Sequence, residues 1–144
     1  MVIEGRTWLE IMPPERCDRH LRQAEVGRIA VIVDGHPEIF PVNYGVDVDG
    51  SIVIRTDRGA KLTALVQHGT VSFEIDGFDT EHHLGWSVLV VGRAKVVATA
   101  QDKARVREMS LQPWAVGDKD TFVRITPDKL TGRRIHMSSQ TASA

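Results

Sequence analysis

The sequence contains a single cysteine, Cys17, in 144 residues. One cysteine cannot form an intramolecular disulfide, and it cannot supply a cluster of thiolate metal ligands. This scarcity fits a reducing compartment, so we expect the protein to be cytoplasmic. Because Cys17 falls within a predicted amphipathic helix, we expect it to pack against the core rather than to act as a reactive thiol.

The sequence also lacks an excess of charge and a long apolar run. Its 18 Lys and Arg residues and 19 Asp and Glu residues leave a formal net charge of −1, which gives no overall electrostatic case for nucleic acid or an anionic membrane as a partner. No stretch is long enough to span a bilayer, and the N-terminus has no basic-then-apolar signal pattern. We therefore expect neither partner, and any basic site has to be local.

Motifs for covalent catalysis and for metal binding are missing as well. The sequence has no Gly-x-Ser-x-Gly elbow, no Gly-rich Walker loop and no zinc-protease helix motif. His82 and His83 stand beside Asp79 and Glu81, but adjacent residues of an extended segment point to opposite sides and rarely chelate one ion. No other histidine completes a ligand set by its spacing, so we predict no metal site.

Segments typical of β-strands dominate what is present. Asp34-Gly35 and Asp49-Gly50 are strong hairpin signals between β-branched segments. Gly92 lies inside a long apolar segment and predicts a bulge or bend of the kind that closes a small barrel. The predicted strands cover residues 28–33, 37–48, 51–56, 70–76, 86–98, 121–126 and 133–137. The predicted helices cover residues 15–24, 59–67 and 100–109.

Six or seven strands joined mainly by hairpins, with short helices at the junctions, predict a mainly β protein. This order favours an antiparallel barrel with flanking helices over a doubly wound parallel sheet. The length is typical of one domain. We place that domain at residues 1–137 and expect a flexible C-terminal tail at residues 138–144, which are small and polar.

The segment from Arg55 to Leu62 is the strongest candidate for a binding site. A strand ends at Arg55 and Thr56, and Asp57 is predicted to cap the helix that follows. Gly59 would let the backbone approach a ligand, while Arg55 and Lys61 bring two cations to the helix entrance. A phosphate is well accommodated by such an entrance, although a capped turn with surface cations has the same pattern.

A few polar and aromatic residues elsewhere suggest a second set of contacts. Asn43 and Tyr44 are expected to lie beside Arg55, where they could form a polar lip for a planar heterocycle. Trp86 and Trp114 stand at junctions, where large rings often contact a ligand or another subunit, or simply pack. The segment Gly132-Arg133-Arg134 could bind an anion or only solvate a late strand, and Glu74 is expected to pair with a cation such as Arg55 or Lys61.

Eight short motifs occur in order between about Cys17 and Met137. They are Gly27-Arg28-Ile29-Ala30, Pro41-Val42-Asn43-Tyr44, Arg55-Thr56, Gly59-Ala60-Lys61-Leu62, Phe73-Glu74-Ile75-Asp76, Gly85-Trp86-Ser87-Val88, Pro113-Trp114-Ala115-Val116-Gly117 and Gly132-Arg133-Arg134-Ile135. Together they resemble the pyridoxamine 5'-phosphate oxidase-like family of FMN-binding split barrels. Within that family the sequence is most similar to the subgroup that includes the nitroimidazole-resistance proteins.

The resemblance implies a six-stranded antiparallel split β-barrel that forms a homodimer with its cofactor sites at the subunit interface. It implies that the anion at the helix entrance is the phosphate of FMN. By the motif match, the phosphate and ribityl chain would be held by Arg55, Thr56, Lys61 and Leu62. The isoalloxazine would be lined by Asn43 and Tyr44, and it would be approached near the start of the long strand by Trp86 and Ser87. Trp114 and Arg133 are weaker candidates, as contributions from the other subunit.

The implied function is that of an FMN-binding flavoprotein, an oxidoreductase acting on an unidentified small molecule. The vitamin-B6 oxidases carry a C-terminal substrate motif with Arg and His that is absent here, so we do not expect oxidation of pyridoxamine phosphate. The alternatives are a deazaflavin-dependent reductase, a non-catalytic flavin- or haem-binding protein, or a structural barrel with an empty groove. No residue is identified as catalytic.

Overall fold

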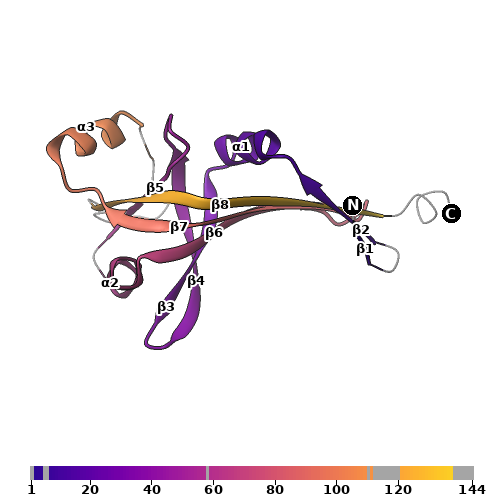
Figure 1. Ribbon diagram of the computed structural model, residues 1–144, viewed down its shortest axis with the longest axis horizontal. Coiled ribbons are helices and arrows are strands. Elements are labelled where there is room, and N and C mark those ends of the chain that lie inside the picture. Colours follow the sequence, from indigo (N-terminus) through magenta and orange to yellow (C-terminus); the bar gives the residue numbers. More distant parts are fainter. Residues whose placement is uncertain (1, 5–6, 58, 110, 112–120, 138–144) are drawn as a thin grey trace.

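The computed structural model describes residues 2–4, 7–57, 59–109, 111 and 121–137 (Figure 1). The described part of the chain contains strands and short helices in the order β1 (Val2–Glu4), β2 (Thr7–Met12), α1 (Pro14–Gln23), β3 (Val26–Val33), β4 (His36–Val46), β5 (Ile52–Thr56), α2 (Ala60–His68), β6 (Thr70–Asp79), β7 (Leu84–Val96), α3 (Ala100–Glu108) and β8 (Thr121–Met137). Among these residues, no helix combines the length and the apolar character needed to cross a membrane.

Six strands close into an antiparallel ring. Their order is β8–β5–β4–β3–β6–β7, and β7 pairs with β8 to complete the ring. The N-terminal part of β8 pairs with β5, whereas its C-terminal part pairs with β2, which lies outside the ring. One long strand therefore belongs to the barrel at one end and to a side sheet at the other. This side sheet consists of β2, the C-terminal parts of β8 and β6, and the N-terminal part of β7. This is the six-stranded split β-barrel that the sequence predicts.

Both predicted hairpins are present, with turns of different length. Asp34 and Gly35 have φ angles of 51° and 81°, as expected for a two-residue turn. The second turn is longer, because Gly50 donates its N–H to the carbonyl of Asp47 (2.9 Å) and Asp47 donates to Ser51 (2.9 Å). Side-chain oxygens of two aspartates accept further backbone N–H groups in this turn, a local bond that favours turns over strands.

The last two predicted strands are wrong as separate elements, since residues 121–137 form the single strand β8. The predicted bulge at Gly92 is confirmed by a shift of the β7–β8 register between Val91 and Gly92. Gly92 lies opposite Pro127, and a Cβ atom at Gly92 would overlap the backbone of Thr126. A proline, which has no N–H to donate, is tolerated in a sheet at such a bulge.

The helices lie close to their predicted positions. Pro14 occupies the first position of α1, and Cys17 and Leu21 turn into the core with 1% and 4% of their surface exposed. Helix α3 is capped by Thr99, whose hydroxyl accepts the N–H of Asp102 (3.1 Å). The predicted cap of α2 by Asp57 is wrong, because Gly59 precedes that helix and no side chain caps it.

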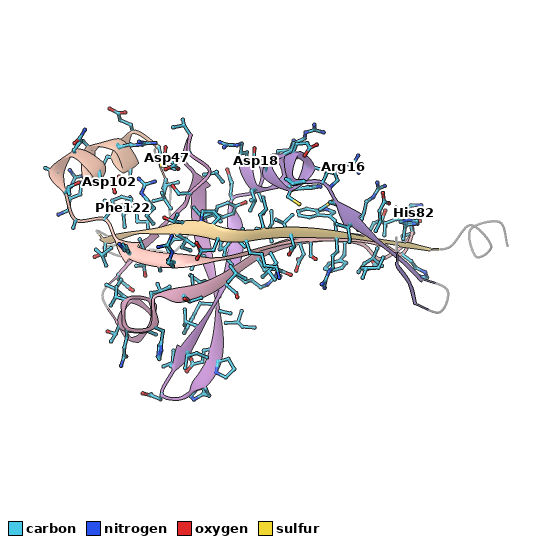
Figure 2. The ribbon with its side chains drawn as sticks, in the orientation of Figure 1. Arg16, Asp18, Asp47, His82, Asp102 and Phe122 are labelled. Carbon is cyan, nitrogen blue, oxygen red and sulfur yellow. The ribbon has the colours of Figure 1, made fainter. Side chains whose placement is uncertain are left out.

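Two apolar clusters hold these elements together. The larger one fills the barrel and includes Ile29, Ile54, Phe73, Val90 and Ile125. The smaller one lies between the barrel and α3 and contains Val53, Val97, Val106 and Phe122 (Figure 2). Figure 1 shows α1 and α3 on one side of the β6–β7–β8 layer, and α2 with the β3–β4 hairpin on the other side. The contact between α1 and the side sheet encloses a cavity.

Candidate functional site

The junction between β5 and α2 holds the predicted phosphate residues. Arg55 is half-buried, its guanidinium lies 5.5 Å from the ring centre of Phe122, and it donates a long hydrogen bond to the carbonyl of Leu111 (3.5 Å). Thr56 is fully buried, and its hydroxyl donates to the carbonyl of Asp57 (3.3 Å). Arg55 is therefore the better placed of the two to contact a ligand through its side chain.

The N-terminus of α2 suits an anion. Its first backbone N–H groups receive no side-chain cap, and its first turn contains no acidic residue, so they keep their partial positive charge. A Cβ atom at Gly59 would meet nothing within 4 Å, which leaves open space at the helix entrance. Lys61 lies in the first turn of α2, but its side chain lies outside the described part of the structure.

Asn43 and Tyr44 point to opposite faces of β4. Tyr44 pairs with Ile54 in the β4–β5 ladder, so alternation places Asn43 on the same face as Arg55 and Tyr44 on the other face. Asn43 lines a cavity of about 290 Å³ that Leu111 also lines. The predicted lip of amide, phenol and guanidinium is therefore reduced to Asn43 and Arg55.

Tyr44 belongs to the core. Its side chain is 4% exposed, its hydroxyl donates to the carbonyl of Leu21 (2.6 Å), and its ring meets Phe73 edge-on at 4.8 Å. Burial raises the pKa of this phenol. Leu62 is also directed inward, where it packs partly buried against the same cluster.

Ser87 lies on the outer face of β7, beside a charged cluster. In the sheet it lies between Asp76 on β6 and Arg133 on β8. Arg28 forms ion pairs with Glu74 (3.2 Å) and Asp76 (2.9 Å). The expectation that Glu74 pairs with Arg55 or Lys61 is wrong, because Arg28 is its direct neighbour across the β3–β6 ladder. Burial and the neighbouring Asp76 raise the pKa of Glu74.

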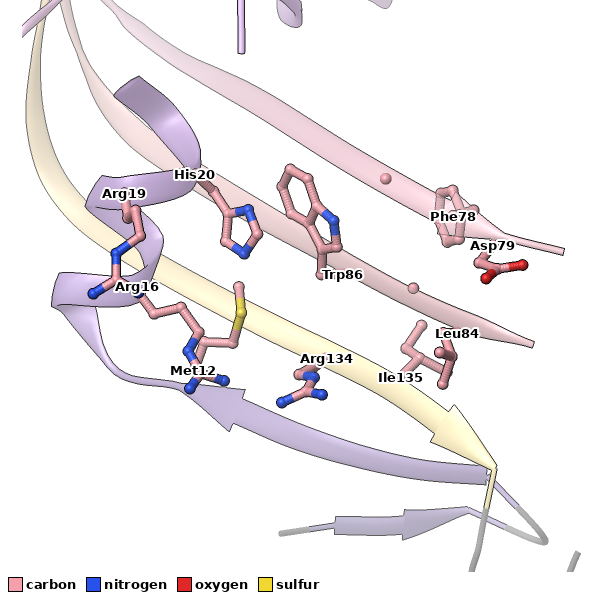
Figure 3. A pocket seen from close by; sticks show the side chains of 12 residues that line it. Met12, Arg16, Arg19, His20, Phe78, Asp79, Leu84, Trp86, Arg134 and Ile135 are labelled. Carbon is pink, nitrogen blue, oxygen red and sulfur yellow. The ribbon is translucent and has the colours of Figure 1, made fainter. Parts of the chain in front are cut away.

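Trp86 points the other way, toward α1. Its indole stacks on His20 with ring centres 3.8 Å apart and planes 20° from parallel, and it lies over Gly77, where a Cβ atom would be only 2.6 Å from its Nε1. The stack forms one wall of a cavity of about 700 Å³ between α1 and the side sheet (Figure 3). The cavity is lined by Met12, Arg16, Arg19, His20, Gly77, Phe78, Asp79, Leu84, Gly85, Trp86, Arg134 and Ile135.

Within one chain, the predicted residues do not form a single site. Arg55 pairs with Phe122 on β8, while Ser87 pairs with Arg133, eleven residues further along the same strand. At a rise of about 3.3 Å per residue, the two positions are roughly 35 Å apart. Figure 1 shows that β8 runs nearly straight over this length. One flavin mononucleotide is too short to contact both groups in the same chain.

The basic residues of α1 at the cavity were missed by sequence reasoning. Arg16, Arg19 and His20 follow the i, i+3, i+4 spacing of one helix face, a signal that the sequence contains. Burial lowers the pKa of His20, and the charges of Arg16 and Arg19 lower it further. Of residues 132–134, Arg134 lines this cavity, whereas Arg133 lies on the face of Ser87.

Two further predictions concern metals and Trp114. Among the described residues, no three His, Cys, Asp or Glu side chains lie together in a way that could hold a metal ion. The imidazole of His82 instead pairs with Asp79 at 2.8 Å. Trp114 and the C-terminal tail from residue 138 lie outside the described residues.

Comparison with known proteins places this arrangement in a family. The family model described as pyridoxamine 5'-phosphate oxidase matches residues 13–134. The uncharacterized protein Rv0080 of Mycobacterium tuberculosis is 36% identical over 128 residues, which cover 85% of this chain and 83% of the relative. The solved FAD binding protein of Mycobacterium smegmatis is 35% identical, covers 90% of this chain and 100% of its own, and superposes with a TM-score of 0.78.

A more distant structure shares the fold. A proposed 5-nitroimidazole antibiotic resistance protein of Bacteroides thetaiotaomicron is 15% identical, with a TM-score of 0.74 over 91% of this chain and 90% of the other. The predicted family is thus confirmed by a model that matches most of the chain and by a close relative of similar length. The chain belongs to the pyridoxamine 5'-phosphate oxidase family.

Proposed function

We propose that this protein binds a flavin, with FMN as the expected form, and acts as a homodimeric oxidoreductase on a small molecule. The observation that carries the proposal is the uncapped N-terminus of α2 beside Arg55, found in a chain 35% identical to a protein named for FAD binding. FAD contains the isoalloxazine, ribityl and first phosphate groups of FMN. The same phosphate site therefore suits either flavin.

The residues of the junction would hold the phosphate in two ways. Free backbone N–H groups at the start of α2 donate to its oxygens, and the guanidinium of Arg55 supplies a charge-assisted bond. Thr56 shapes the junction, because its hydroxyl is already bonded to Asp57. When bound, a flavin supplies hydride or electron transfer, and the protein positions it and controls access.

The distance between Arg55 and Ser87 supports the homodimer. The motif match assigns both residues to one cofactor, but along β8 their partners are eleven residues apart. If both residues contact one flavin, they come from two chains. Each site would then combine the β5–α2 junction and Asn43 of one subunit with Ser87 and Arg133 of the other.

The first test is a visible absorption spectrum of the purified protein, followed by titration with FMN, FAD and a deazaflavin coenzyme. We expect a flavin band that shifts on binding and saturates. Arg55→Ala should weaken this binding by about 1.5–3 kcal/mol, or roughly 10- to 150-fold, because it removes a charge-assisted bond. Arg93→Ala is the matched control, since Arg93 is an exposed arginine that pairs with Asp128 (3.3 Å).

The remaining outcomes separate the alternatives. Saturable binding of the deazaflavin alone would replace the flavin proposal with a deazaflavin-dependent function. Binding of neither compound would remove the oxidoreductase proposal and make haem the next candidate. Equal flavin affinity in Arg55→Ala and the parent would contradict the site. Light scattering should give twice the subunit mass of 16.0 kDa, and a monomer that binds flavin with full affinity would contradict the shared site.

A further inference from the structure

The cavity beneath α1 combines positive charge with apolar walls. Arg16 and Arg19 line it from α1, and Arg134 lines it from β8. Figure 3 shows Arg16 and Arg134 on either side of Met12, with His20 and Trp86 beside them. The apolar part of the wall comes from Met12 and Leu84, which lie on the same face of the sheet as Trp86 and Arg134.

Within the described part of the chain, the side chains of Arg16, Arg19 and Arg134 form neither an ion pair nor a hydrogen bond. Among the described residues that line the cavity, Asp79 is the one carboxylate, and it accepts from the backbone and imidazole of His82. Glu10, which lies next to Arg134 in the β2–β8 ladder, has its carboxylate 3.6 Å from the imidazole of His136.

Three arginines with exposed side chains line the same cavity. Arg16 and Arg19 lie close enough to His20 to lower its pKa, in addition to the larger effect of burial. A single anion placed among these groups would reduce the repulsion and would also provide the hydrogen-bond acceptors that a guanidinium requires. Inorganic anions alone would leave the apolar walls exposed to water, so the occupant should have an apolar body.

We propose that the cavity between α1 and the side sheet binds a small organic anion, with its carboxylate or phosphate at Arg16 and Arg134 and its apolar body against Met12, Leu84 and the Trp86–His20 stack. A volume of about 700 Å³ accommodates a molecule of that class. This site is separate from the proposed flavin site. Trp86 lines it, whereas Ser87 faces the other side of the sheet.

The test compares two probes of the same shape, 2-naphthoate and its neutral amide 2-naphthamide, by isothermal titration calorimetry. We expect 2-naphthoate to bind and the amide to bind at least about tenfold more weakly, since the amide lacks the charge that the arginines recognise. Arg134→Ala and Arg16→Ala should each weaken 2-naphthoate about tenfold or more. The control is Arg22→Ala, because Arg22 is on the same helix but pairs with Asp18 (2.8 Å) and does not line the cavity.

Repeating the titration with FMN-saturated protein separates this site from the flavin site. We expect 2-naphthoate to bind with the same affinity with and without FMN, and we expect Arg55→Ala to leave that affinity unchanged. Equal affinities for the acid and the amide would overturn the proposal. An unchanged affinity in Arg134→Ala would overturn it as well, and competition between FMN and 2-naphthoate would reassign the cavity to the flavin.

Discussion

Helices α1 and α3 both lie against the sheet with arginines at the contact, but the two contacts treat these charges differently. Beneath α3, Arg124 on β8 forms ion pairs with Asp47 (2.8 Å) and Asp102 (2.6 Å), and Arg105 also reaches Asp47 (2.9 Å) (Figure 2). Beneath α1, Arg134 on the same strand lines a cavity without a carboxylate partner among the described residues. We call the ion-paired group of Asp47, Asp102, Arg105 and Arg124 the saturated cluster. We call the arginines of the cavity, Arg16, Arg19 and Arg134, the unsaturated cluster. Strand β8 contributes one arginine to each.

The difference separates structural cations from cations available to a ligand. Asp47 is 5% exposed, and burial alone would raise its pKa, but hydrogen bonds from Arg105, Arg124 and the backbone of Val48 lower it to about 2. That network attaches α3 to the barrel. Arg134 has an exposed side chain without an ion pair or hydrogen bond among the described residues, so its charge is available to a ligand.

The largest effect should come from breaking the saturated cluster. Asp47→Ala would leave the largely buried Arg124 with one carboxylate and the half-exposed Arg105 with none. Because it removes hydrogen bonds between charged groups, we expect a loss of about 2–3 kcal/mol in the free energy of unfolding, measured by urea denaturation. The matched control is Asp18→Ala, which breaks an exposed i, i+4 pair with Arg22 and should cost about 0.5 kcal/mol or less. Similar losses of stability in Asp47→Ala and Asp18→Ala would contradict a structural role for the saturated cluster.

The same cluster predicts a dependence of stability on pH. Because the folded-state pKa of Asp47 is about 2, below its ordinary value of 3.8, its contribution is present above about pH 4 and is lost as the pH falls toward 2. We expect that loss to be about 2 kcal/mol. Denaturation curves at pH 5 and pH 2.5 should show a smaller decrease in Asp47→Asn than in the parent. Equal decreases would mean that other carboxylates cause the effect.

Two glycines on neighbouring strands test whether the cavity wall is rigid. A Cβ atom at Gly77 would lie 2.6 Å from the indole of Trp86, which His20 confines from α1, while a Cβ atom at Gly85 would lie 2.6 Å from the ring of Phe78, which is 65% exposed. We expect Gly77→Ala to cost about 1–3 kcal/mol of stability, since Trp86 has to move. Gly85→Ala should cost less, because Phe78 can turn into solvent. A larger cost for Gly85→Ala in urea denaturation would contradict this view of the wall.

The comparison also shows which features could be predicted from the sequence. Hairpins, the bulge at Gly92 and the helices depend on residues close together in the chain, and most were predicted correctly. Asp47 and Arg124 are 77 residues apart, and the pairing of β2 with β8 joins the two ends of the described chain. No local pattern identifies such partners.

The candidate site shows the same limit at the level of single residues. Alternation places adjacent residues on opposite faces, but it does not say which face is the interior. Asn43 and Tyr44 were therefore predicted to act together, although Tyr44 is in the core. For the same reason Trp86 and Ser87, grouped by the motif match, face different sites.

The smallest effect on stability should come from the unsaturated cluster. Arg134→Ala should change the free energy of unfolding by about 0.5 kcal/mol or less, because its exposed side chain makes no bond that the structure describes. Arg124→Ala on the same strand is the matched comparison, and it should be strongly destabilising, because Asp102 loses its ion pair and the buried Asp47 keeps only the half-exposed Arg105. Urea denaturation of the two variants measures the difference. If Arg134→Ala were as destabilising as Arg124→Ala, Arg134 would be a structural residue, and its place in the cavity would need no ligand to explain it.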